Sequence, residues 1–189
     1  MNLSLLWDYL LYGWTASEIV IAVATRTGKD GGKVRDRGSM LVMWAVVASA
    51  VTAAEFLRYG ALATIHAGAQ GLKLAGLVVM IVGLVVRWTA ILSLGKSFSA
   101  NVAIHVTQTV YRGGLYRWLR HPSYSGLLLI FAAIALHERN WLAAVVVMLP
   151  TTAALLYRIH VEEAVLREAF GTEYVEYSKT TWRLIPGVY

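Results

Sequence analysis

Five long apolar stretches, separated by short polar segments, dominate the hydrophobic pattern of this chain. A helix needs about 17–25 mostly apolar residues to cross the hydrocarbon core of a bilayer, and each stretch reaches or approaches that length. The pattern therefore predicts an all-α integral membrane protein with about five transmembrane helices. The predicted spans are approximately Leu3–Ala24, Ser39–Leu57, Gly71–Leu94, Pro122–Leu136 and Trp141–Tyr157.

The composition agrees with a membrane protein. Of the 189 residues, 58% are hydrophobic and 15% are charged, whereas a soluble domain is nearer half apolar and a quarter charged. The absence of Cys excludes disulfides, thiolate metal sites and cysteine nucleophiles. The first stretch carries Asp8 and Glu18 and has no basic segment before it, so we expect a retained helix and not a signal peptide.

Basic residues concentrate at one end of the predicted helices. Most of the 17 Lys and Arg lie between the first and second stretches, between the third and fourth, or after the fifth. With five crossings, these segments share one side of the membrane. The positive-inside rule places that side and the C-terminus in the cytoplasm, and the N-terminus outside. These loops also explain the net charge of +6, so nucleic-acid binding is not expected.

We expect one membrane domain over residues 1–189, with three spans in residues 1–94. Residues 95–189 would add a cytoplasmic cofactor-binding loop, two further spans, and a C-terminal cytoplasmic helix and tail. The loop, Gly95–Arg120, mixes apolar with polar residues, which suits a segment that folds over a site. No internal repeat is present, which argues against an inverted-repeat transporter.

Two polar clusters flank the last two apolar stretches. Arg120–Tyr124 precedes the fourth stretch, and Arg158–Glu163 follows the fifth. Ionisable groups at the edge of a bilayer are costly and mark a functional site by default. Both clusters lie at the same end of consecutive spans, so we expect them to meet in space.

Arg158 and Glu162 are four residues apart, which places both side chains on one face of a helix. The spacing fits either a helix-surface ion pair or a functional pair, and the location at the end of an apolar span favours function. Glu163 points about 100° further round the helix, where a structural or solvated role is expected.

His121 and Pro122 begin the fourth span. Pro is favoured in the first turn of a helix, and open amides in that turn are a favourable place for a carboxylate. His121 is expected to cap the helix or to bind a ligand, and Gly126 to permit close approach of another helix. Arg87, inside the third span, is expected to snorkel or to pair with an acid. No metal site is expected, because the His spacings do not match metal ligands.

Short motifs follow one another in a fixed order along the C-terminal half of the chain. They are Gly114-Leu115-Tyr116, Arg120-His121-Pro122-Ser123-Tyr124-Ser125-Gly126, Arg158 with Glu162-Glu163, Phe170-Gly171-Thr172-Glu173-Tyr174 with Tyr177, and Ile185-Pro186. This set resembles the isoprenylcysteine carboxyl methyltransferase family and its phospholipid methyltransferase relatives. The resemblance covers about Gly95 to Pro186, and the N-terminal half matches only as generic spans.

The resemblance implies a membrane enzyme that uses S-adenosylmethionine, releases S-adenosylhomocysteine, and acts on a lipophilic or prenylated substrate. It implies that Arg158 meets the substrate and that Arg158 and Glu162 are catalytic. It also implies a set of cofactor contacts in the loop and the last two spans. They are Gln108, Thr109, Val110, Tyr111, Tyr116, His121, Pro122, Ser123, Tyr124 and Glu162.

Carboxyl O-methylation of an isoprenylcysteine-like substrate is the favoured activity. A carboxylate is ionised at neutral pH and needs no general base, and Arg158 would orient it. The alternative is an aminolipid N-methyltransferase, but Arg158 would repel its cationic amine, and a base such as Glu163 would be required. An NADPH-dependent sterol-reductase-like enzyme and a non-enzymatic membrane scaffold are the remaining alternatives.

Overall fold

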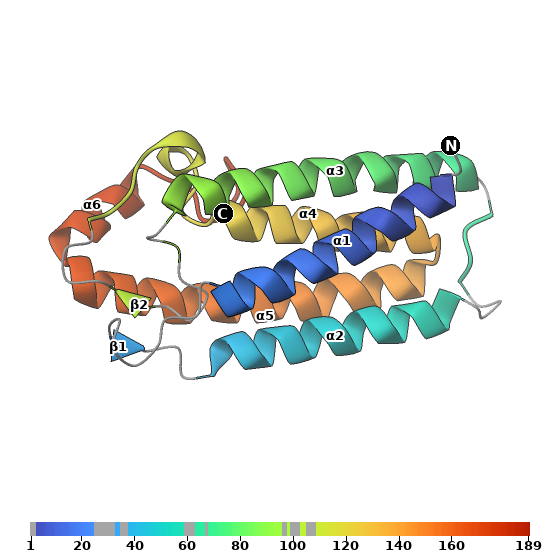
Figure 1. Ribbon diagram of the computed structural model, residues 1–189, viewed down its shortest axis with the longest axis horizontal. Coiled ribbons are helices and arrows are strands. Elements are labelled where there is room, and N and C mark those ends of the chain that lie inside the picture. Colours follow the sequence, from blue (N-terminus) through green and yellow to red (C-terminus); the bar gives the residue numbers. More distant parts are fainter. Residues whose placement is uncertain are drawn as a thin grey trace.

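Five long helices run back and forth along one bundle, so the connections that precede α2, α4 and α6 gather at the same end (Figure 1). The computed structural model describes residues 3–24, 33–34, 38–58, 63–66, 68–95, 98, 103–104 and 109–189. The long helices are α1 (Leu3–Ala24), α2 (Ser39–Arg58), α3 (Ala69–Leu94), α4 (Pro122–Glu138) and α5 (Trp141–Phe170).

Short elements occupy the end where these connections gather. Strands β1 (Lys33–Val34) and β2 (Ala103–Ile104) pair antiparallel. The 3₁₀-helix η2 (Gly114–Arg117) precedes α4, and α6 (Thr172–Lys179) follows α5. Gly171, with φ 53°, separates α5 from α6. A positive φ of this kind suits glycine, so the chain turns sharply here.

The five predicted spans are confirmed as helices. Among the described residues, α2, α3 and α5 are long and apolar enough to cross a membrane, and α4 is a shorter apolar helix. α1 has 22 residues and includes Asp8 and Glu18. α5 continues through Pro150 to Phe170 as one helix of 30 residues, so the predicted extension after the fifth span belongs to the same helix.

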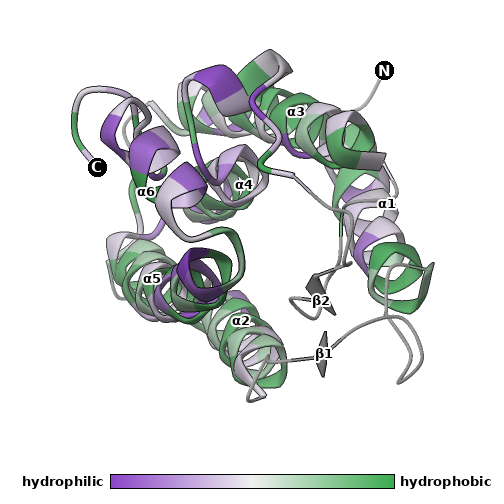
Figure 2. Ribbon diagram, turned by 90° about the vertical axis from the view of Figure 1, so that its left-hand side faces the viewer, coloured by the Kyte–Doolittle hydropathy of each residue, from purple (hydrophilic) through white to green (hydrophobic). Residues whose placement is uncertain are grey.

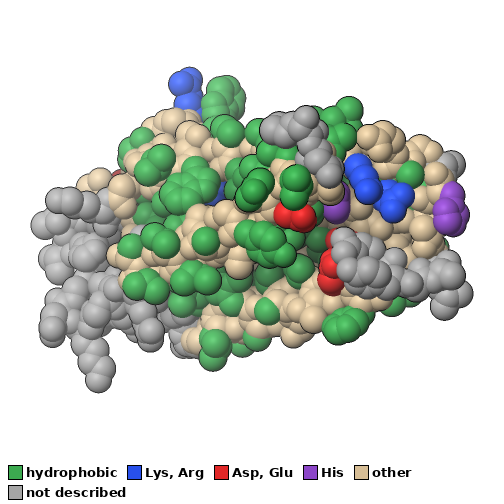
Figure 3. Space-filling model, turned by 45° about the vertical axis from the view of Figure 1, so that its right-hand side comes forward, with side chains coloured by type: hydrophobic (Ala, Val, Ile, Leu, Met, Phe, Trp, Pro, Cys, Tyr) green, Lys and Arg blue, Asp and Glu red, His purple; other side chains and the backbone are tan. Residues whose placement is uncertain are grey.

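The outer faces of the long helices are apolar. Large hydrophobic side chains such as Val23, Leu41, Val85, Leu92 and Leu149 are exposed. Seen along the bundle, the helix bodies are mostly hydrophobic, and hydrophilic segments gather around α6 (Figure 2). Figure 3 shows apolar side chains spread over one face, on which charged ones are few. A surface of this kind suits lipid and not water, as expected of a multi-pass membrane protein.

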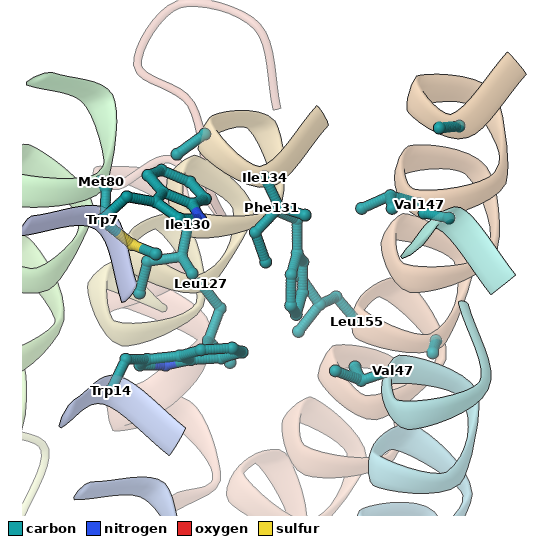
Figure 4. Packing of buried hydrophobic residues seen from close by; sticks show 14 of the residues in the cluster. Trp7, Trp14, Val47, Met80, Leu127, Ile130, Phe131, Ile134, Val147 and Leu155 are labelled. Carbon is teal, nitrogen blue, oxygen red and sulfur yellow. The ribbon is translucent and has the colours of Figure 1, made fainter. Parts of the chain in front are cut away.

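α4 is the central helix of the core. It packs against α3 along its length and also contacts α5, while α2 packs on α5 and α1 on α3. Its apolar side chains meet residues from all four other long helices (Figure 4). The residues labelled there are Trp7, Trp14, Val47, Met80, Leu127, Ile130, Phe131, Ile134, Val147 and Leu155.

Glycines bring the backbones of α3 and α4 close together. A Cβ atom added at Gly126 would lie 2.7 Å from the backbone N and 2.8 Å from the Cα of Arg87. One added at Gly83 would lie 2.9 Å from Cγ1 of Ile130. Small residues permit this approach between membrane helices, so the expectation for Gly126 is confirmed, and α3 is its partner.

A buried ion pair joins α1 to α3. Arg87 Nη2 donates to Glu18 Oε2 at 2.6 Å, and Arg87 Nε donates to Glu18 Oε1. Trp14 Nε1 also donates to Glu18 Oε1, at 3.0 Å, and Arg87 Nη1 donates to the carbonyl of Ser123, at 3.2 Å. Arg87 therefore pairs with an acid inside the bundle, and the alternative expectation that it snorkels is wrong.

Replacing Gly126 with Ala should destabilise the bundle, because the new methyl group would collide with backbone atoms that no rotamer change can move. We expect a loss of about 1–3 kcal/mol, measured as a lower Tm in detergent. Gly13→Ala is the matched control, since a Cβ atom there meets nothing within 4 Å and Ala favours the helix. Equal Tm values for the two variants would contradict the close contact between α3 and α4.

Removing one member of the Glu18–Arg87 pair should cost about 3–5 kcal/mol, because the other charge is left buried without its partner. The double variant Glu18→Leu, Arg87→Leu should lose much less than the sum of the two single losses. A double-mutant cycle on thermal unfolding measures this coupling. Additive losses would mean that the two side chains do not stabilise each other.

Candidate active site

A cavity opens at the end of the bundle where η2 and α6 lie. It encloses about 1160 Å³ of space between atoms, part of it open to solvent, and residues from all six α-helices line it. Side chains from both ends of the sequence therefore face one shared space.

The structure brings most of the predicted site residues to this cavity. Pro122 is buried at the start of α4 but does not line it, and Gln108 lies outside the described residues. The predicted residues that line the cavity are Thr109, Val110, Tyr111, Tyr116, His121, Ser123, Tyr124, Arg158 and Glu162. The two polar clusters recognised in the sequence therefore meet, as expected.

A chain of hydrogen bonds connects Arg158 to Glu162 through Tyr124. Arg158 Nε donates to the Tyr124 hydroxyl at 3.2 Å, and that hydroxyl donates to Glu162 Oε2 at 2.8 Å. Arg158 Nη1 also donates to Ser39 Oγ at 2.5 Å. Arg158 is only 1% exposed, whereas the Glu162 side chain is 25% exposed. The arginine is thus fixed in the wall, and the carboxylate remains accessible from the cavity.

His121 faces the two neighbouring carboxylates of α5. Its Nδ1 lies 4.0 Å from Glu162 Oε1, and its Nε2 lies 3.5 Å from Glu163 Oε1. Its ring stacks on that of Tyr124, with centroids 5.6 Å apart. The side chain makes no capping hydrogen bond to α4. Of the two expectations for His121, the structure favours a residue of the site over a helix cap.

Glu163 is buried among arginines. Arg120 Nε and Arg167 Nη2 each donate to its carboxylate at 2.9 Å, and Arg183 Nε donates at 3.2 Å. Nearby cations favour the charged form of a carboxyl group, so Glu163 is an ionised structural centre. The expectation of a structural role is met, and the alternative that Glu163 is solvated is wrong.

The C-terminal segment crosses the start of α4. Arg120 Nη1 donates to the carbonyls of Ser178, at 2.7 Å, and Thr181. The backbone N–H of Arg120 donates to Trp182 at 2.7 Å, and that of His121 donates to Arg183 at 3.1 Å. The C-terminal segment therefore packs on the residues that precede α4, a contact that the sequence did not reveal because the two segments are distant in the chain. That the first-turn amides of α4 receive a carboxylate stays a prediction.

Helix α6 holds the neighbouring loop in place. Glu173 accepts hydrogen bonds from the N–H of Val110, at 3.3 Å, and from Arg112 Nη2 through its carbonyl, at 3.2 Å. The Tyr177 hydroxyl donates to the carbonyl of Tyr116 at 2.7 Å. Burial raises the pKa of Tyr177 to about 12, although Arg120 and Arg112 oppose the shift. The hydroxyl therefore stays protonated and keeps this bond.

Several cavity residues were missed by the sequence reasoning. Tyr174 and Tyr177 stood in one of the motifs but were not predicted to be site residues, although their spacing of three places both on one face of α6. Apolar residues from α1 and α2 give no such signal, because lipid-facing and cavity-facing side chains look alike in the sequence. They are Ile21, Ala22, Met40, Met43 and Trp44. The cavity is thus apolar along α1 and α2 apart from Glu18, whereas α5 contributes both charged and apolar side chains to it.

Comparisons with known proteins agree with this arrangement. The sequence profile of the isoprenylcysteine carboxyl methyltransferase (ICMT) family matches residues 75–168. A probable protein-S-isoprenylcysteine O-methyltransferase of Oryza sativa subsp. indica is 35% identical over 113 residues, which are 59% of this chain and 59% of that protein. Protein-S-isoprenylcysteine O-methyltransferase A of Arabidopsis thaliana is 32% identical over 115 residues, 60% of this chain and 58% of that protein.

A solved structure, described as the eukaryotic intramembrane Ras methyltransferase ICMT, is also similar. The TM-score is 0.62 at 27% identity, and the match covers 77% of this chain and 52% of that one. This chain thus spans about three fifths or less of the relatives that it matches. The matched family profile runs from α3 to α5 and includes both polar clusters of the cavity. Residues 75–168 of this chain are thus similar to the isoprenylcysteine carboxyl methyltransferase family.

Proposed function

We propose that this protein is an S-adenosylmethionine-dependent methyltransferase that methylates the carboxyl group of a lipophilic, isoprenylcysteine-like substrate at the membrane. The observation that carries the proposal is the connection of Arg158 to Glu162 through Tyr124 in the wall of one cavity. The names of the relatives support the same reaction. The apolar wall along α1 and α2 suits a hydrophobic substrate.

The residues present fit such a cofactor. Glu162 offers an accessible carboxylate, which suits the amine or hydroxyl groups of S-adenosylmethionine. His121 lines the cavity beside it, with Nδ1 4.0 Å from Glu162 Oε1 and Nε2 3.5 Å from Glu163 Oε1. Its ring is therefore held next to the carboxylate that would receive the cofactor. Thr109, Val110, Tyr111 and Tyr116 would line the same cofactor.

When bound, the cofactor supplies an electrophilic methyl group. Arg158 would orient the substrate carboxylate toward it, because a guanidinium group binds a carboxylate in a fixed geometry. Tyr124 and Ser39 hold Arg158 in place, so little ordering is required when the substrate arrives. The loop and α6 would limit the access of water, which strengthens electrostatic interactions inside the cavity.

The arrangement disfavours the aminolipid N-methyltransferase alternative. That reaction requires a base for the ammonium proton, and Glu163 was the candidate. Three arginines already bind Glu163, so its carboxylate is a weak base. Glu163 also does not line the cavity. The similarity of residues 75–168 to the ICMT family also makes the NADPH-dependent reductase and the non-enzymatic scaffold less favoured.

We propose that the end of the bundle with the cavity faces the cytoplasm. Arg112, Arg117 and Arg120 lie at this end, with Arg167, Lys179 and Arg183 further along the chain. The positive-inside rule then places the N-terminus on the other side. The basic residues between α1 and α2 lie mostly outside the described residues. Their placement on the cytoplasmic side therefore rests on the sequence.

Glu162 and Arg158 should affect different steps. Glu162→Gln removes a charge from the cofactor site, so we expect about 10- to 100-fold weaker binding of S-adenosylmethionine in detergent. Arg158→Lys should change the affinity for S-adenosylmethionine by no more than a few-fold. It should lower kcat/KM for the carboxylate substrate by about 10- to 100-fold. Glu176→Gln is the control, because this exposed residue pairs with Lys179 on α6 and does not line the cavity. Equal effects of all three substitutions would contradict the assignment.

The chemical stability of the product distinguishes O-methylation from N-methylation. With a radiolabelled methyl donor and a farnesylated cysteine analogue, we expect label that base releases as methanol, because esters hydrolyse and methylamines do not. An aminolipid should accept no label under the same conditions. A base-stable label on the aminolipid would instead support the N-methyltransferase.

A further inference from the structure

Tyr174 lines the cavity, and its hydroxyl group is buried without a hydrogen-bond partner among the described residues. Tyr174 is only 2% exposed and belongs to α6. A buried hydroxyl that is left unsatisfied costs free energy. Native structures retain such a group where something else completes its bonding. In a cavity wall, the simplest such partner is the ligand.

The surroundings of Tyr174 indicate which kind of partner it needs. Burial raises the pKa of its hydroxyl, and the negative charges of Glu163 and Glu162 raise it further. The hydroxyl therefore stays protonated and is available as a donor. The same two carboxylates disfavour an anionic acceptor beside it, so the acceptor is a neutral atom.

The neighbouring side chains favour a flat aromatic ligand group. Phe170, Leu166 and Tyr177 line the cavity together with Tyr174. The rings of Tyr174 and Tyr177 lie 6.0 Å apart in an edge arrangement. Aromatic and aliphatic walls with one hydrogen-bond donor are typical of sites that bind a heterocycle. The purine of the proposed cofactor is such a group, with ring nitrogens that are neutral acceptors.

We infer that Tyr174 contacts the methyl donor directly and donates a hydrogen bond to a ring nitrogen of its purine. The inference rests on the proposed function, since it requires S-adenosylmethionine in this cavity. It adds a residue of α6 that binds the purine to the proposed cofactor contacts on η2, α4 and α5. It also gives α6 a second role besides holding the loop.

The test compares Tyr174→Phe with Tyr177→Phe, two substitutions that each remove one hydroxyl from the same helix. The Tyr177 hydroxyl donates to the carbonyls of Tyr116 and Leu119, at 2.7 and 3.3 Å. Its loss should therefore lower the Tm of the ligand-free protein. Tyr174→Phe should leave that Tm unchanged or raise it, because it removes an unsatisfied group. Binding of S-adenosylhomocysteine to Tyr174→Phe, measured by calorimetry, should be about 3- to 10-fold weaker.

Analogues of S-adenosylhomocysteine in which CH replaces N1, N3 or N7 identify the acceptor. One analogue should bind the wild type about 3- to 10-fold more weakly than the parent compound, yet bind Tyr174→Phe as well as the parent does. If all three analogues lose the same affinity in both proteins, the purine assignment is overturned.

Two further outcomes separate this inference from the proposed function. If the wild type binds S-adenosylhomocysteine and Tyr174→Phe binds it equally well, the contact does not exist and only the inference fails. A lower Tm of ligand-free Tyr174→Phe with unchanged affinity would likewise make the hydroxyl structural. If the wild type binds neither S-adenosylmethionine nor S-adenosylhomocysteine, the proposed function fails, and the inference fails with it.

Discussion

Glu163 is the buried carboxylate on which the arrangement of the cavity depends. An isolated ionised carboxylate in a low-dielectric environment is very unfavourable, so it must be surrounded by cations and hydrogen-bond donors. Its partners are Arg167 on its own helix, Arg120 before α4, and Arg183 in the C-terminal segment. One charge thus ties together three parts of the chain that are distant in the sequence. The position of His121 and the packing of the C-terminal segment before α4 both follow from that connection.

The adjacent acid, Glu162, is accessible from the cavity, whereas Glu163 is enclosed, although the two residues are neighbours in the sequence. The helix turns by about 100° between them, so one carboxylate is enclosed by arginines and the other faces the cavity. Tyr124 then links Glu162 to Arg158, one turn earlier on the same helix. A structural charge and a charge available to ligands therefore lie side by side without competing for the same partners.

The sequence was a good guide to features that depend on local composition. Apolar length placed all five long helices, and the first predicted span, Leu3–Ala24, agrees with α1 at both ends. The meeting of the two polar clusters was also foreseen, because consecutive membrane helices bring their ends together. Contacts between distant segments could not be read in this way. The pairing of Arg87 with Glu18 and the packing of the C-terminal segment before α4 depend on contacts that no short motif encodes.

The length of α5 has a consequence for the depth at which chemistry takes place. Its 30 residues extend for about 45 Å, whereas the oily interior of a bilayer is about 30 Å thick. The final turns of this rigid rod must therefore reach beyond the lipid tails. Arg158 and Glu162 lie one turn apart on this helix. Near that boundary, the lipid-borne acceptor and the water-borne donor of the proposed reaction could each stay in its own phase. Hydrophobic mismatch would shift both residues together, so the thickness of the host bilayer becomes a variable that would act on the proposed reaction.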